Sequence, residues 1–516
     1  MVGSAALPLS VLWVLAASPA DSVPYTLWAA PSVQKVFRDA EPSGLGEPAH
    51  IYAAANEFEA VQALLTAGTE SLEDVTVRVM PFRRERHAIG SASVTLYLAH
   101  YVPCPATGKD YPDPLPPLRD GFDVPAGTSQ PIWIEVFVPE GTPAGDYAGG
   151  IVVTPANAPG RRLPLRLTVY GFELPDQVHA VTAFGISDDC VFDKHGVASS
   201  DGQATNARAR LRQRYYEFLL EHKISPYYLP VDLRSPWASK YLNDPRLTSF
   251  AVPYREDEGY LRDIAAYLRE RGLLKKAYFY VVDEPVARPS YDEIRHVAEV
   301  LHRVDPQLRL VAPFYRAPDW DESQTPFDEL TGYLDIWCPN AHYFDLNPRV
   351  HQQIQERRAA GETAWCYVCC GPGEPYNNFF VQMSGLSHRL LFTQLWRLGV
   401  EGLLYWSTTY WAAVADPWTD MTTVPDINKS IYGDGSLLYP GKPVGIDGPV
   451  ASIRLKIIRD GIEDYEYLRL LAQRRGMLAA HRAAEALCPS LSQYTRDPAT
   501  FAFLRHKIAR EIEPDR

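Results

Sequence analysis

The chain contains, at residues 276–286, the sequence Lys-Ala-Tyr-Phe-Tyr-Val-Val-Asp-Glu-Pro-Val. A run of aromatic and β-branched residues stops at two adjacent acids, Asp283 and Glu284, and a proline follows them. This pattern is typical of a buried strand that carries carboxylates to the rim of a pocket. If the strand belongs to a barrel of parallel strands, the acids lie at the end of the barrel where catalysis takes place.

The chain around this strand alternates between strand patterns and helix patterns. We predict strands near residues 181–187, 224–229, 247–252, 277–282, 307–313, 333–338, 363–369 and 402–407. We predict helices between most of them, including residues 207–222, 260–271, 291–304, 348–360 and 387–398. Eight strands with crossover helices predict a (β/α)8 TIM-type barrel over residues 176–449, in which the acid pair closes the fourth strand.

The regions on either side of the barrel have different patterns. Residues 24–175 contain short strand-like runs separated by Gly, Pro, Asn and Asp, near residues 33–37, 75–80, 94–98, 132–138, 149–154 and 163–169. They predict a supporting β-sandwich, with a proline-dense, extended connection at residues 102–131. Residues 450–516 predict a C-terminal helical segment that closes the barrel. Its acids at positions 460, 463, 464 and 466 are interpreted as a solvated helix face with local caps.

Composition narrows the class of protein. A chain of 516 residues with 46% hydrophobic residues predicts two or three globular domains. The formal net charge of −13 argues against nucleic acid or an anionic membrane as a partner. Seven cysteines are too few for a disulfide scaffold. Cys366, Cys369 and Cys370 have no second Cys or His pair at zinc-site spacing, so we interpret them as core residues and expect no metal or cofactor.

Residues 1–20 resemble a secretory signal peptide, with an apolar core followed by Ser18-Pro19-Ala20, although no Lys or Arg precedes the core. The segment is too short, and too broken by Pro8 and Pro19, to span a bilayer, and no later segment is a transmembrane candidate. We therefore expect a secreted or periplasmic protein. The sequence makes no prediction of its oligomeric state.

The acid pair calls for a chemical explanation. A capping box, Ser290 to Glu293, starts the next predicted helix, so neither acid is needed as its cap. A structural ion pair with Arg316 or Arg255 is the alternative. Two close carboxyls cannot both ionise easily, so their pKa values should separate and leave one of them protonated near neutral pH. A carboxylic acid of that kind suits glycoside cleavage, in which the leaving oxygen must be protonated.

Adjacent acids make a poor pair of nucleophile and acid, because the two must act on opposite faces of the sugar. They suit substrate-assisted catalysis better, in which the 2-acetamido group of the sugar attacks its own anomeric carbon. Asp283 would then orient and polarise the acetamido N–H, and Glu284 would act first as the acid and then as the base.

Seven short motifs carry a resemblance to a known family, and they span nearly the whole chain after the leader. They are Asn56-Glu-Phe-Glu-Ala-Val-Gln62, Tyr111-Pro-Asp-Pro-Leu115, Gln130-Pro-Ile-Trp133, Pro143-Ala-Gly-Asp-Tyr147, Val282-Asp-Glu-Pro285, Gly433-Asp-Gly-Ser-Leu-Leu-Tyr-Pro-Gly441 and Ile453-Arg-Leu-Lys-Ile-Ile-Arg-Asp-Gly-Ile-Glu-Asp-Tyr465. With these motifs the chain resembles glycoside hydrolase family 123, the β-N-acetylgalactosaminidase-type enzymes and their uncharacterised relatives. The resemblance implies a β-sandwich followed by a barrel, and retaining hydrolysis through an oxazolinium intermediate. It gives Asp283 and Glu284 the roles stated above.

Residues at the ends of other strands would complete a sugar pocket and contact a glycan or glycoconjugate substrate. The candidates are Asn340, His342, Tyr343, Trp365, Tyr367, Tyr376, Asn378, Trp406, Tyr410 and Trp411. Aromatic rings at such positions can stack on sugar faces, and Trp406 is the foremost candidate.

Two other readings of the chain remain open. One is a two-carboxylate retaining β-glycosidase with Glu284 as acid/base and Glu374 as nucleophile. The other is a catalytically silent, carbohydrate-binding barrel. Loss of hydrolysis on substituting Asp283 or Glu284 supports the substrate-assisted enzyme, and loss on substituting Glu374 supports the two-carboxylate enzyme. Glycan binding without hydrolysis by the wild-type protein identifies the silent barrel.

Overall fold

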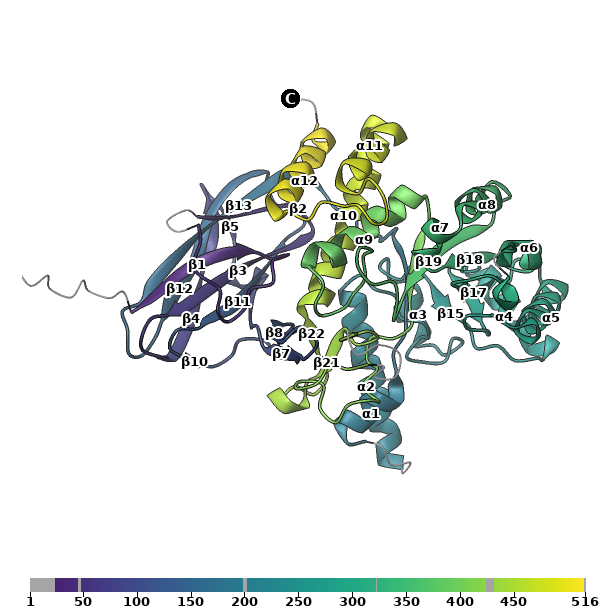
Figure 1. The fold of residues 1–516 in the computed structure, drawn as a ribbon, viewed down its shortest axis with the longest axis horizontal. Helices are drawn as coiled ribbons and strands as arrows, with labels where there is room; N and C mark the ends of the chain where they lie inside the picture. The colour runs from purple at the N-terminus through teal and green to yellow at the C-terminus, as the bar shows by residue number, and fades with distance from the viewer. Residues whose placement is uncertain (1–23, 45–47, 198–201, 322, 424–430, 515–516) are drawn as a thin grey trace, which may run out of the picture.

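The computed structural model describes residues 24–44, 48–197, 202–321, 323–423 and 431–514. The predicted signal peptide at residues 1–20 lies outside them. The described chain forms an N-terminal β-sandwich, a nearly closed barrel of mostly parallel strands, and C-terminal helices at the junction of the two (Figure 1). No helix of the described residues is long and apolar enough to cross a membrane.

The sandwich has two sheets. The strands of one, in spatial order, are β1 (Tyr25–Pro31), β3 (Glu57–Ala67), β11 (Ser129–Val138) and β6 (Val94–Leu98). Those of the other are β10 (Phe122–Val124), β4 (Leu72–Arg84), β12 (Gly145–Thr154), β13 (Arg161–Glu173) and β2 (Ala49–Ala55), with β5 (His87–Ile89) paired to β4. Alternate residues of β11, such as Ile132 and Ile134, fill the core between the sheets, while Trp133 packs on the other side. The predicted sandwich is therefore confirmed.

Parts of the sandwich differ from the predictions. The predicted strand at residues 33–37 is wrong, because Gln34 donates its N–H to the Pro31 carbonyl (3.1 Å) and the chain turns after β1. The strands β1, β2 and β3 were not predicted. The proline-dense connection contains, besides β10, the short strands β7 (Tyr101–Cys104), β8 (Lys109–Pro112) and β9 (Pro114–Leu115). The last of these pairs with β22 (Pro449–Ser452), which also pairs with β21 (Leu438–Pro440).

Seven strands form the barrel sheet. In spatial order they are β14 (Val181–Phe184), β20 (Gly402–Tyr405), β19 (Thr363–Val368), β18 (Ile336–Pro339), β17 (Leu310–Phe314), β16 (Ala277–Tyr280) and β15 (Phe250–Ala251). All six pairings between them are parallel. Side chains such as Tyr278 and Cys338 fill the barrel interior, which is therefore a packed core. In such barrels the active site lies at the carboxyl ends of the strands.

The predicted strand at residues 224–229 is reduced to a single parallel bridge between Phe184 and Pro226. Proline has no N–H to donate, so a longer ladder cannot form there. The segment still lies between β14 and β15, because Tyr227 donates its N–H to Phe184 (2.9 Å) and accepts from Ala251 (2.6 Å). These bonds nearly close the barrel where an eighth strand would stand. The predicted third strand likewise shortens to the two residues of β15.

Twelve α-helices lie within the described residues: α1 (Asp188–His195), α2 (Gly202–Glu221), α3 (Ala238–Leu242), α4 (Glu258–Glu270), α5 (Arg288–Val304), α6 (Pro326–Leu330), α7 (Tyr343–Leu346), α8 (Pro348–Ala359), α9 (Gly385–Leu398), α10 (Ile453–Arg475), α11 (Met477–Leu487) and α12 (Pro498–Ile512). The five predicted barrel helices correspond to α2, α4, α5, α8 and α9. The predicted capping box at Ser290 is wrong, because α5 begins at Arg288 after an N-cap residue, Ala287, that makes no side-chain cap.

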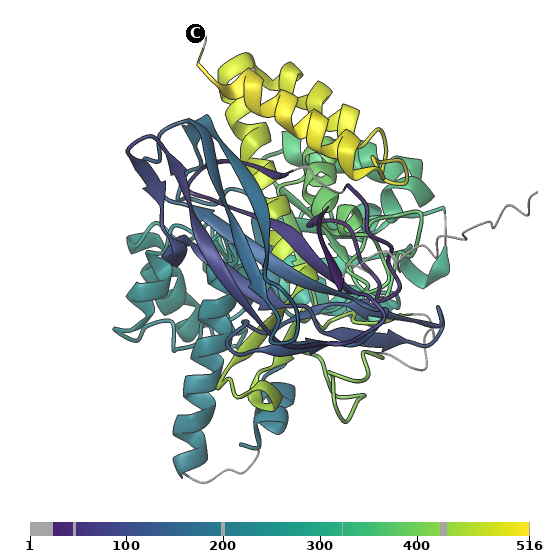
Figure 2. The same ribbon diagram turned by 90° about the vertical axis from the view of Figure 1, so that its left-hand side faces the viewer.

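α10 lies between the sandwich and the barrel, and α12 runs along the same junction (Figures 1 and 2). Arg389 of α9 binds Glu59 of β3 (Nη2–Oε2 2.9 Å) and Asp464 of α10 (Nε–Oδ2 2.6 Å). Arg505 of α12 binds the other oxygen of Asp464 (2.6 Å) and also Glu57. All five side chains are buried, so the junction depends on their mutual pairing.

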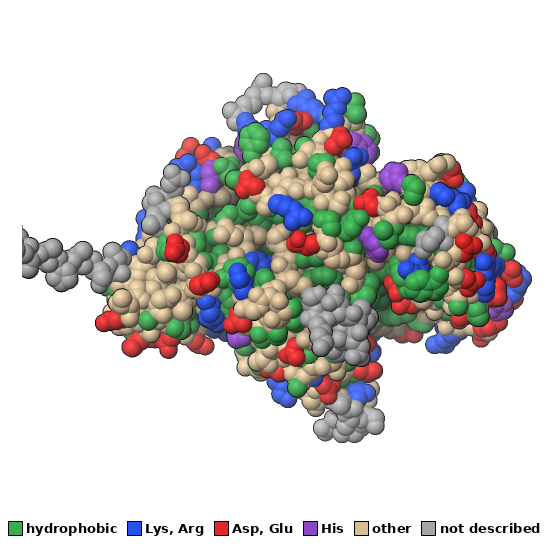
Figure 3. Space-filling view, viewed as in Figure 1, with side chains coloured by type: hydrophobic (Ala, Val, Ile, Leu, Met, Phe, Trp, Pro, Cys, Tyr) green, Lys and Arg blue, Asp and Glu red, His purple; other side chains and the backbone are tan. Residues whose placement is uncertain are grey.

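The predicted solvated face of α10 is therefore wrong. Its acids at positions 460, 463, 464 and 466 are 0% to 6% exposed, because the outer face of β3 and β11 covers the helix. On the same helix, Arg459 and Lys456 both bind Glu135 of β11 (2.7 Å and 3.1 Å). On the face shown in Figure 3, acidic and basic side chains are interspersed rather than gathered in a patch of one sign.

Candidate functional site

The acid pair follows β16 where the chain has already left the strand. β16 ends at Tyr280, three residues before Asp283. Glu284 has a φ of 43°, which is uncommon for a residue with a side chain and costs on the order of 1 kcal/mol or more. Asp283 is exposed and Glu284 is half-buried, so the two carboxylates have different surroundings. The turn in the chain allows neighbouring side chains to approach one site.

Each acid has a tyrosine partner. The hydroxyl of Tyr280 donates to Oδ1 of Asp283 (2.7 Å), and the hydroxyl of Tyr367, on β19, donates to Oε1 of Glu284. Burial raises the pKa of Glu284; the hydrogen bond from Tyr367 opposes this rise and the charge of Asp283 adds to it. The predicted protonated acid is consistent with this surrounding of Glu284.

Polar groups at the end of β18 extend the site from Tyr367. Asn340 is buried, forms a parallel bridge to Tyr367, and lies 2.5 Å (Oδ1) from Nδ1 of His342. Burial lowers the pKa of His342, which favours a neutral imidazole. The ring of Tyr376 meets His342 edge-on at 6.1 Å. The structure thus brings four predicted site residues into one chain of contacts that ends at Glu284.

Trp406, which follows β20, is fixed by a buried carboxylate. Its Nε1 donates to Oδ2 of Asp434 (3.1 Å), and the hydroxyl of Tyr405 donates to Oδ1 of the same residue (3.1 Å). Asp434 is 1% exposed, and burial raises its pKa to about 6. The ring of Tyr410 lies 4.8 Å from that of Trp406. Asp434 stands in the motif Gly433–Gly441, but no role was predicted for it, because only the fold shows what its carboxylate binds.

A cavity of about 390 Å³ opens beside Trp406. Its wall includes Tyr227 and Tyr228 from the bridging segment, and Pro253 from the loop after β15. The ring of Tyr227 meets that of Tyr280 edge-on at 5.8 Å, and Tyr280 in turn binds Asp283. The cavity therefore lies on the side of β16 that faces β15, and Tyr227 and Tyr280 connect its wall to Asp283, which does not line it itself.

Cys369 and Cys370 directly follow β19. The Sγ of Cys370 lies 3.7 Å from that of Cys369, and the Cys369 thiol lowers the pKa of Cys370 by hydrogen bonding, while burial and the charges of Asp434 and Glu284 oppose this. Cys370 is thus within electrostatic range of Asp434 and Glu284. Cys366 is buried as predicted, but Cys369 and Cys370 are half-buried at the rim rather than in the core.

Four predicted site residues lie elsewhere. Trp365 is 2% exposed in the barrel interior and lines a cavity at the opposite end of the barrel, with Thr363 and Glu401. Tyr343 and Trp411 are 1% exposed members of the main hydrophobic core. Asn378 is buried, and its amide donates to the carbonyls of Cys369 and Pro372 (both 2.9 Å), so it orders the loop between β19 and α9.

The residues named in the alternative interpretations are engaged in other contacts. Glu374 lies on an exposed loop with its carboxylate 3.6 Å from Arg496. The guanidinium of Arg316 stacks on Trp320 (3.1 Å to the ring centroid), and that of Arg255 lies over Tyr260 (4.8 Å). The structure therefore gives no ion pair between either arginine and the acid pair among the described residues.

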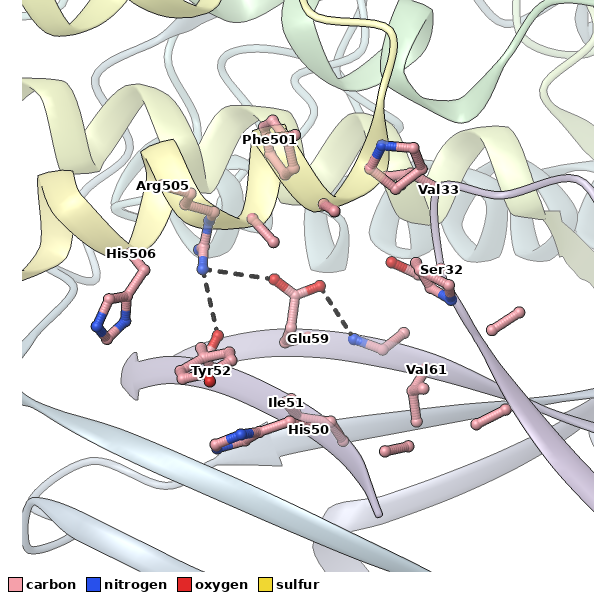
Figure 4. A pocket seen from close by; sticks show the side chains of 18 of the residues that line it. Ser32, Val33, His50, Ile51, Tyr52, Glu59, Val61, Phe501, Arg505 and His506 are labelled. Atoms are coloured by element: carbon pink, nitrogen blue, oxygen red, sulfur yellow. Dashed lines mark hydrogen bonds and ion pairs between the residues drawn. The ribbon is translucent and has the colours of Figure 1, made fainter. Parts of the chain in front are cut away.

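A second cavity, of about 380 Å³, lies at the junction of the sandwich and α12 (Figure 4). Apolar residues such as Val61 and Phe501 line much of it, and the Arg505–Glu59 pair forms part of its wall. The charged groups there already bind one another. It is separate from the acid pair, which lies at the end of the barrel.

Comparisons with known proteins agree with the fold. The model described as the glycoside hydrolase 123 catalytic domain matches residues 218–471, and that of the glycoside hydrolase 123 N-terminal domain matches residues 49–155. A solved structure is similar over 95% of this chain and 97% of its own, with a TM-score of 0.69 and 11% identity. It is described as "The details of glycolipid glycan hydrolysis by the structural analysis of a family 123 glycoside hydrolase from Clostridium perfringens".

Two other structures are similar more weakly. A family 39 glycoside hydrolase from the gut symbiont Bacteroides cellulosilyticus has a TM-score of 0.32 and 9% identity, over 83% of this chain and 82% of its own. A GH5 xyloglucanase from Bacteroides ovatus has a TM-score of 0.28 and 9% identity, over 85% of this chain and 100% of its own. Neither score is high enough to support an argument. No curated protein matches the sequence.

Proposed function

Because this chain belongs to glycoside hydrolase family 123, we propose that it is a retaining glycosidase that removes β-linked N-acetylgalactosamine, or a related 2-acetamido sugar, by substrate-assisted catalysis. Asp283 accepts a hydrogen bond from the acetamido N–H and so directs the acetamido oxygen at the anomeric carbon. Glu284 protonates the glycosidic oxygen as the leaving group departs, and an oxazolinium ion forms.

In the second half of the reaction Glu284, now a carboxylate, removes a proton from water. The water attacks the anomeric carbon of the oxazolinium ion, the ring of that ion opens, and the 2-acetamido sugar leaves with retained configuration. Glu284 returns to its protonated form. Each of the two inversions at the anomeric carbon therefore needs only one carboxyl group from the protein for proton transfer.

One observation carries the proposal. The two adjacent acids differ in burial, and burial raises the pKa of Glu284, the acid whose proposed role needs a proton. The exposed loop position of Glu374, and its contact with Arg496, disfavour the two-carboxylate alternative, which needs a nucleophile across the sugar from Glu284. The cavity between Tyr227 and Trp406 offers room for a sugar ring, and Tyr227 in its wall contacts Tyr280, the hydrogen-bond partner of Asp283.

The test uses an aryl N-acetyl-β-galactosaminide. Glu284→Gln removes the proton donor and Asp283→Asn removes the charge that orients the acetamido group, so each should lower kcat by roughly 100-fold or more. Circular dichroism should show an unchanged fold. An N-acetyl thiazoline, which resembles the oxazolinium ion, should inhibit the wild-type protein, and the matching 2-hydroxy glycoside should be a poor substrate.

The matched control is Glu374→Ala, which should retain activity. Full activity in Glu284→Gln or Asp283→Asn contradicts the mechanism. Loss of activity in Glu374→Ala, with a glycosyl group trapped on the enzyme, supports the two-carboxylate reaction instead. Binding of glycans without any hydrolysis by the wild-type protein supports the silent barrel.

A further inference from the structure

Trp320 is a large aromatic residue that the fold leaves at the surface. It follows β17 in the loop before α6, and it is 62% exposed. A tryptophan side chain that exposed leaves apolar area in water, which is informative where the side chain is also held in place. Loops at this end of a barrel carry substrate contacts.

Arg316 holds the ring of Trp320. Its Cζ lies 3.1 Å from the ring centroid, and its Nε and Nη1 are buried without a hydrogen-bond partner among the described residues. The guanidinium therefore serves as a flat support for one face of the indole. Asp319 and Trp320 both have positive φ, 49° and 62°, a conformation that costs free energy in residues with side chains. The loop thus presents the ring at a cost to its backbone.

The same loop is joined to the segment that carries the acid pair. Asp319 donates its N–H to the carbonyl of Val286 (2.7 Å), only two residues after Glu284. The Asp319 carboxylate accepts from Nε of Arg288 (2.7 Å), and Nη1 of Arg288 binds Glu329 of α6 (2.6 Å). Trp320 is therefore fixed relative to Glu284 through backbone and side-chain contacts.

Strand order places Trp320 on a particular side of the acids. β16, which precedes the acid pair, lies between β15 and β17. The cavity lined by Tyr227 and Trp406 lies on the β15 side, where Tyr227 contacts Tyr280 of β16, whereas Trp320 follows β17 on the other side. If the reacting sugar occupies the cavity, its leaving group extends past Glu284 toward Trp320.

We propose that Trp320, supported by Arg316, is a binding platform for the sugar ring on the leaving-group side of the scissile bond. This proposal rests on the proposed function, and it specifies the substrate as a glycan in which the 2-acetamido sugar is linked to at least one further pyranose. The C–H face of that pyranose stacks on the free face of the indole, as apolar surfaces pack on aromatic rings. Because the ring is already fixed, little conformational entropy is lost on binding.

The test compares two substrates of the same 2-acetamido sugar: its methyl glycoside and an oligosaccharide with a pyranose next to the scissile bond. Trp320→Ala should lower kcat/KM for the oligosaccharide about tenfold more than for the methyl glycoside, mainly through KM. Trp320→Phe keeps a stacking ring and should recover most of the difference. Phe503→Ala removes another exposed aromatic, 69% exposed on α12, and should change neither value.

An equal effect of Trp320→Ala on both substrates, or no effect, overturns the platform while leaving the proposed function intact. If the wild-type protein hydrolyses neither substrate, the proposed function fails, and the platform is judged by calorimetric titration of the same oligosaccharide. Wild-type binding that weakens about tenfold in Trp320→Ala then supports it. Equal affinity, or no binding by the wild-type protein, overturns it.

Discussion

Glu284 and Asp283 are neighbours in the chain, yet their surroundings differ. The half-buried Glu284 accepts a hydrogen bond from Tyr367, while the exposed Asp283 accepts one from Tyr280. A donor hydroxyl stabilises the ionised form of its carboxyl partner and so opposes the effect of burial. The balance between burial and Tyr367 therefore sets the pH range over which Glu284 holds its proton.

Tyr367→Phe should move the high-pH limit of activity upward. Without the Tyr367 hydroxyl, burial acts unopposed by that hydrogen bond and the pKa of Glu284 rises further above its ordinary value of 4.5. A general acid with a higher pKa stays protonated to higher pH, so the fall in kcat/KM on the alkaline side should shift to higher pH. The measurement is kcat/KM against pH for both proteins; a shift to lower pH contradicts the assignment of Glu284 as the acid.

The sequence predicted part of the site. The acid pair stood out because its pattern is local: a strand that ends in two carboxylates. Trp365 and Trp411 were also predicted to contact the sugar, but whether a ring at a strand end points to the pocket or into the core depends on packing with distant segments. For the same reason no role could be predicted for Asp434, which accepts a hydrogen bond from Trp406, 28 residues away in the chain.

At the scale of the elements, the closure between β14 and β20 depends on a glycine. Gly185, directly after β14, donates its N–H to Tyr405 (2.9 Å) and accepts from Thr408 (2.8 Å). A Cβ at position 185 would lie 1.9 Å from the carbonyl oxygen of Trp406. Only a residue without a side chain allows this approach, and the approach sets the position of Trp406.

Gly185→Ala should therefore destabilise the protein by about 1–3 kcal/mol and lower activity by displacing Trp406. The matched control is Gly90→Ala, where a Cβ meets nothing within 4 Å and φ is −70°; it should change stability by less than about 0.5 kcal/mol. Thermal unfolding and kcat/KM measure the two effects. Equal stability of the two variants contradicts the close approach.

The elements that the sequence predicted well are those with a strong local period. Helices such as α4 and α5 were predicted to within a few residues, because apolar positions recur on one face and pack on the barrel. The segment at residues 224–229 has a strand-like composition, but Pro226 limits its ladder, and only its neighbours β14 and β15 hold it in place. Neither the helical period nor the strand-like composition shows which segments far apart in the sequence pair with each other.

At the scale of the whole molecule, the sandwich and the barrel are joined by buried charge. Arg389→Leu should destabilise the protein by about 3–5 kcal/mol, because Glu59 loses its main partner and Asp464 loses one of two. Arg510→Leu, which removes a half-exposed arginine of α12 paired with Glu513, should cost less than about 1 kcal/mol. Urea unfolding at neutral pH measures both.

The destabilisation by Arg389→Leu should also depend on pH. Although burial alone would raise the pKa values of Glu59 and Asp464, Arg389 and Arg505 hold both below their ordinary values of 4.5 and 3.8. Their stabilising contribution is therefore present above those values and is lost as the pH falls through the lowered ones. The gap between wild type and variant should narrow on acidification; a gap that widens contradicts the pairing.

Sequence periodicity could not reveal this junction. The acids of α10 look like a solvated face because charged residues usually are solvated, and the arginines that bind them lie on α9 and α12. The burial of these acids follows from the packing of β3 and β11 against the helix, which brings together segments far apart in the sequence.

The buried ion pairs at the junction decide whether the barrel can be separated from the sandwich. A barrel cut free of the sandwich would keep Arg459 and Lys456 but lose Glu135, and it would keep Arg389 but lose Glu59. Those cations, which are buried in the intact protein, would then lie on an exposed surface without these carboxylate partners. The barrel is consequently not expected to be stable without the sandwich. A truncated or domain-swapped enzyme would need other carboxylates at the positions of Glu135 and Glu59.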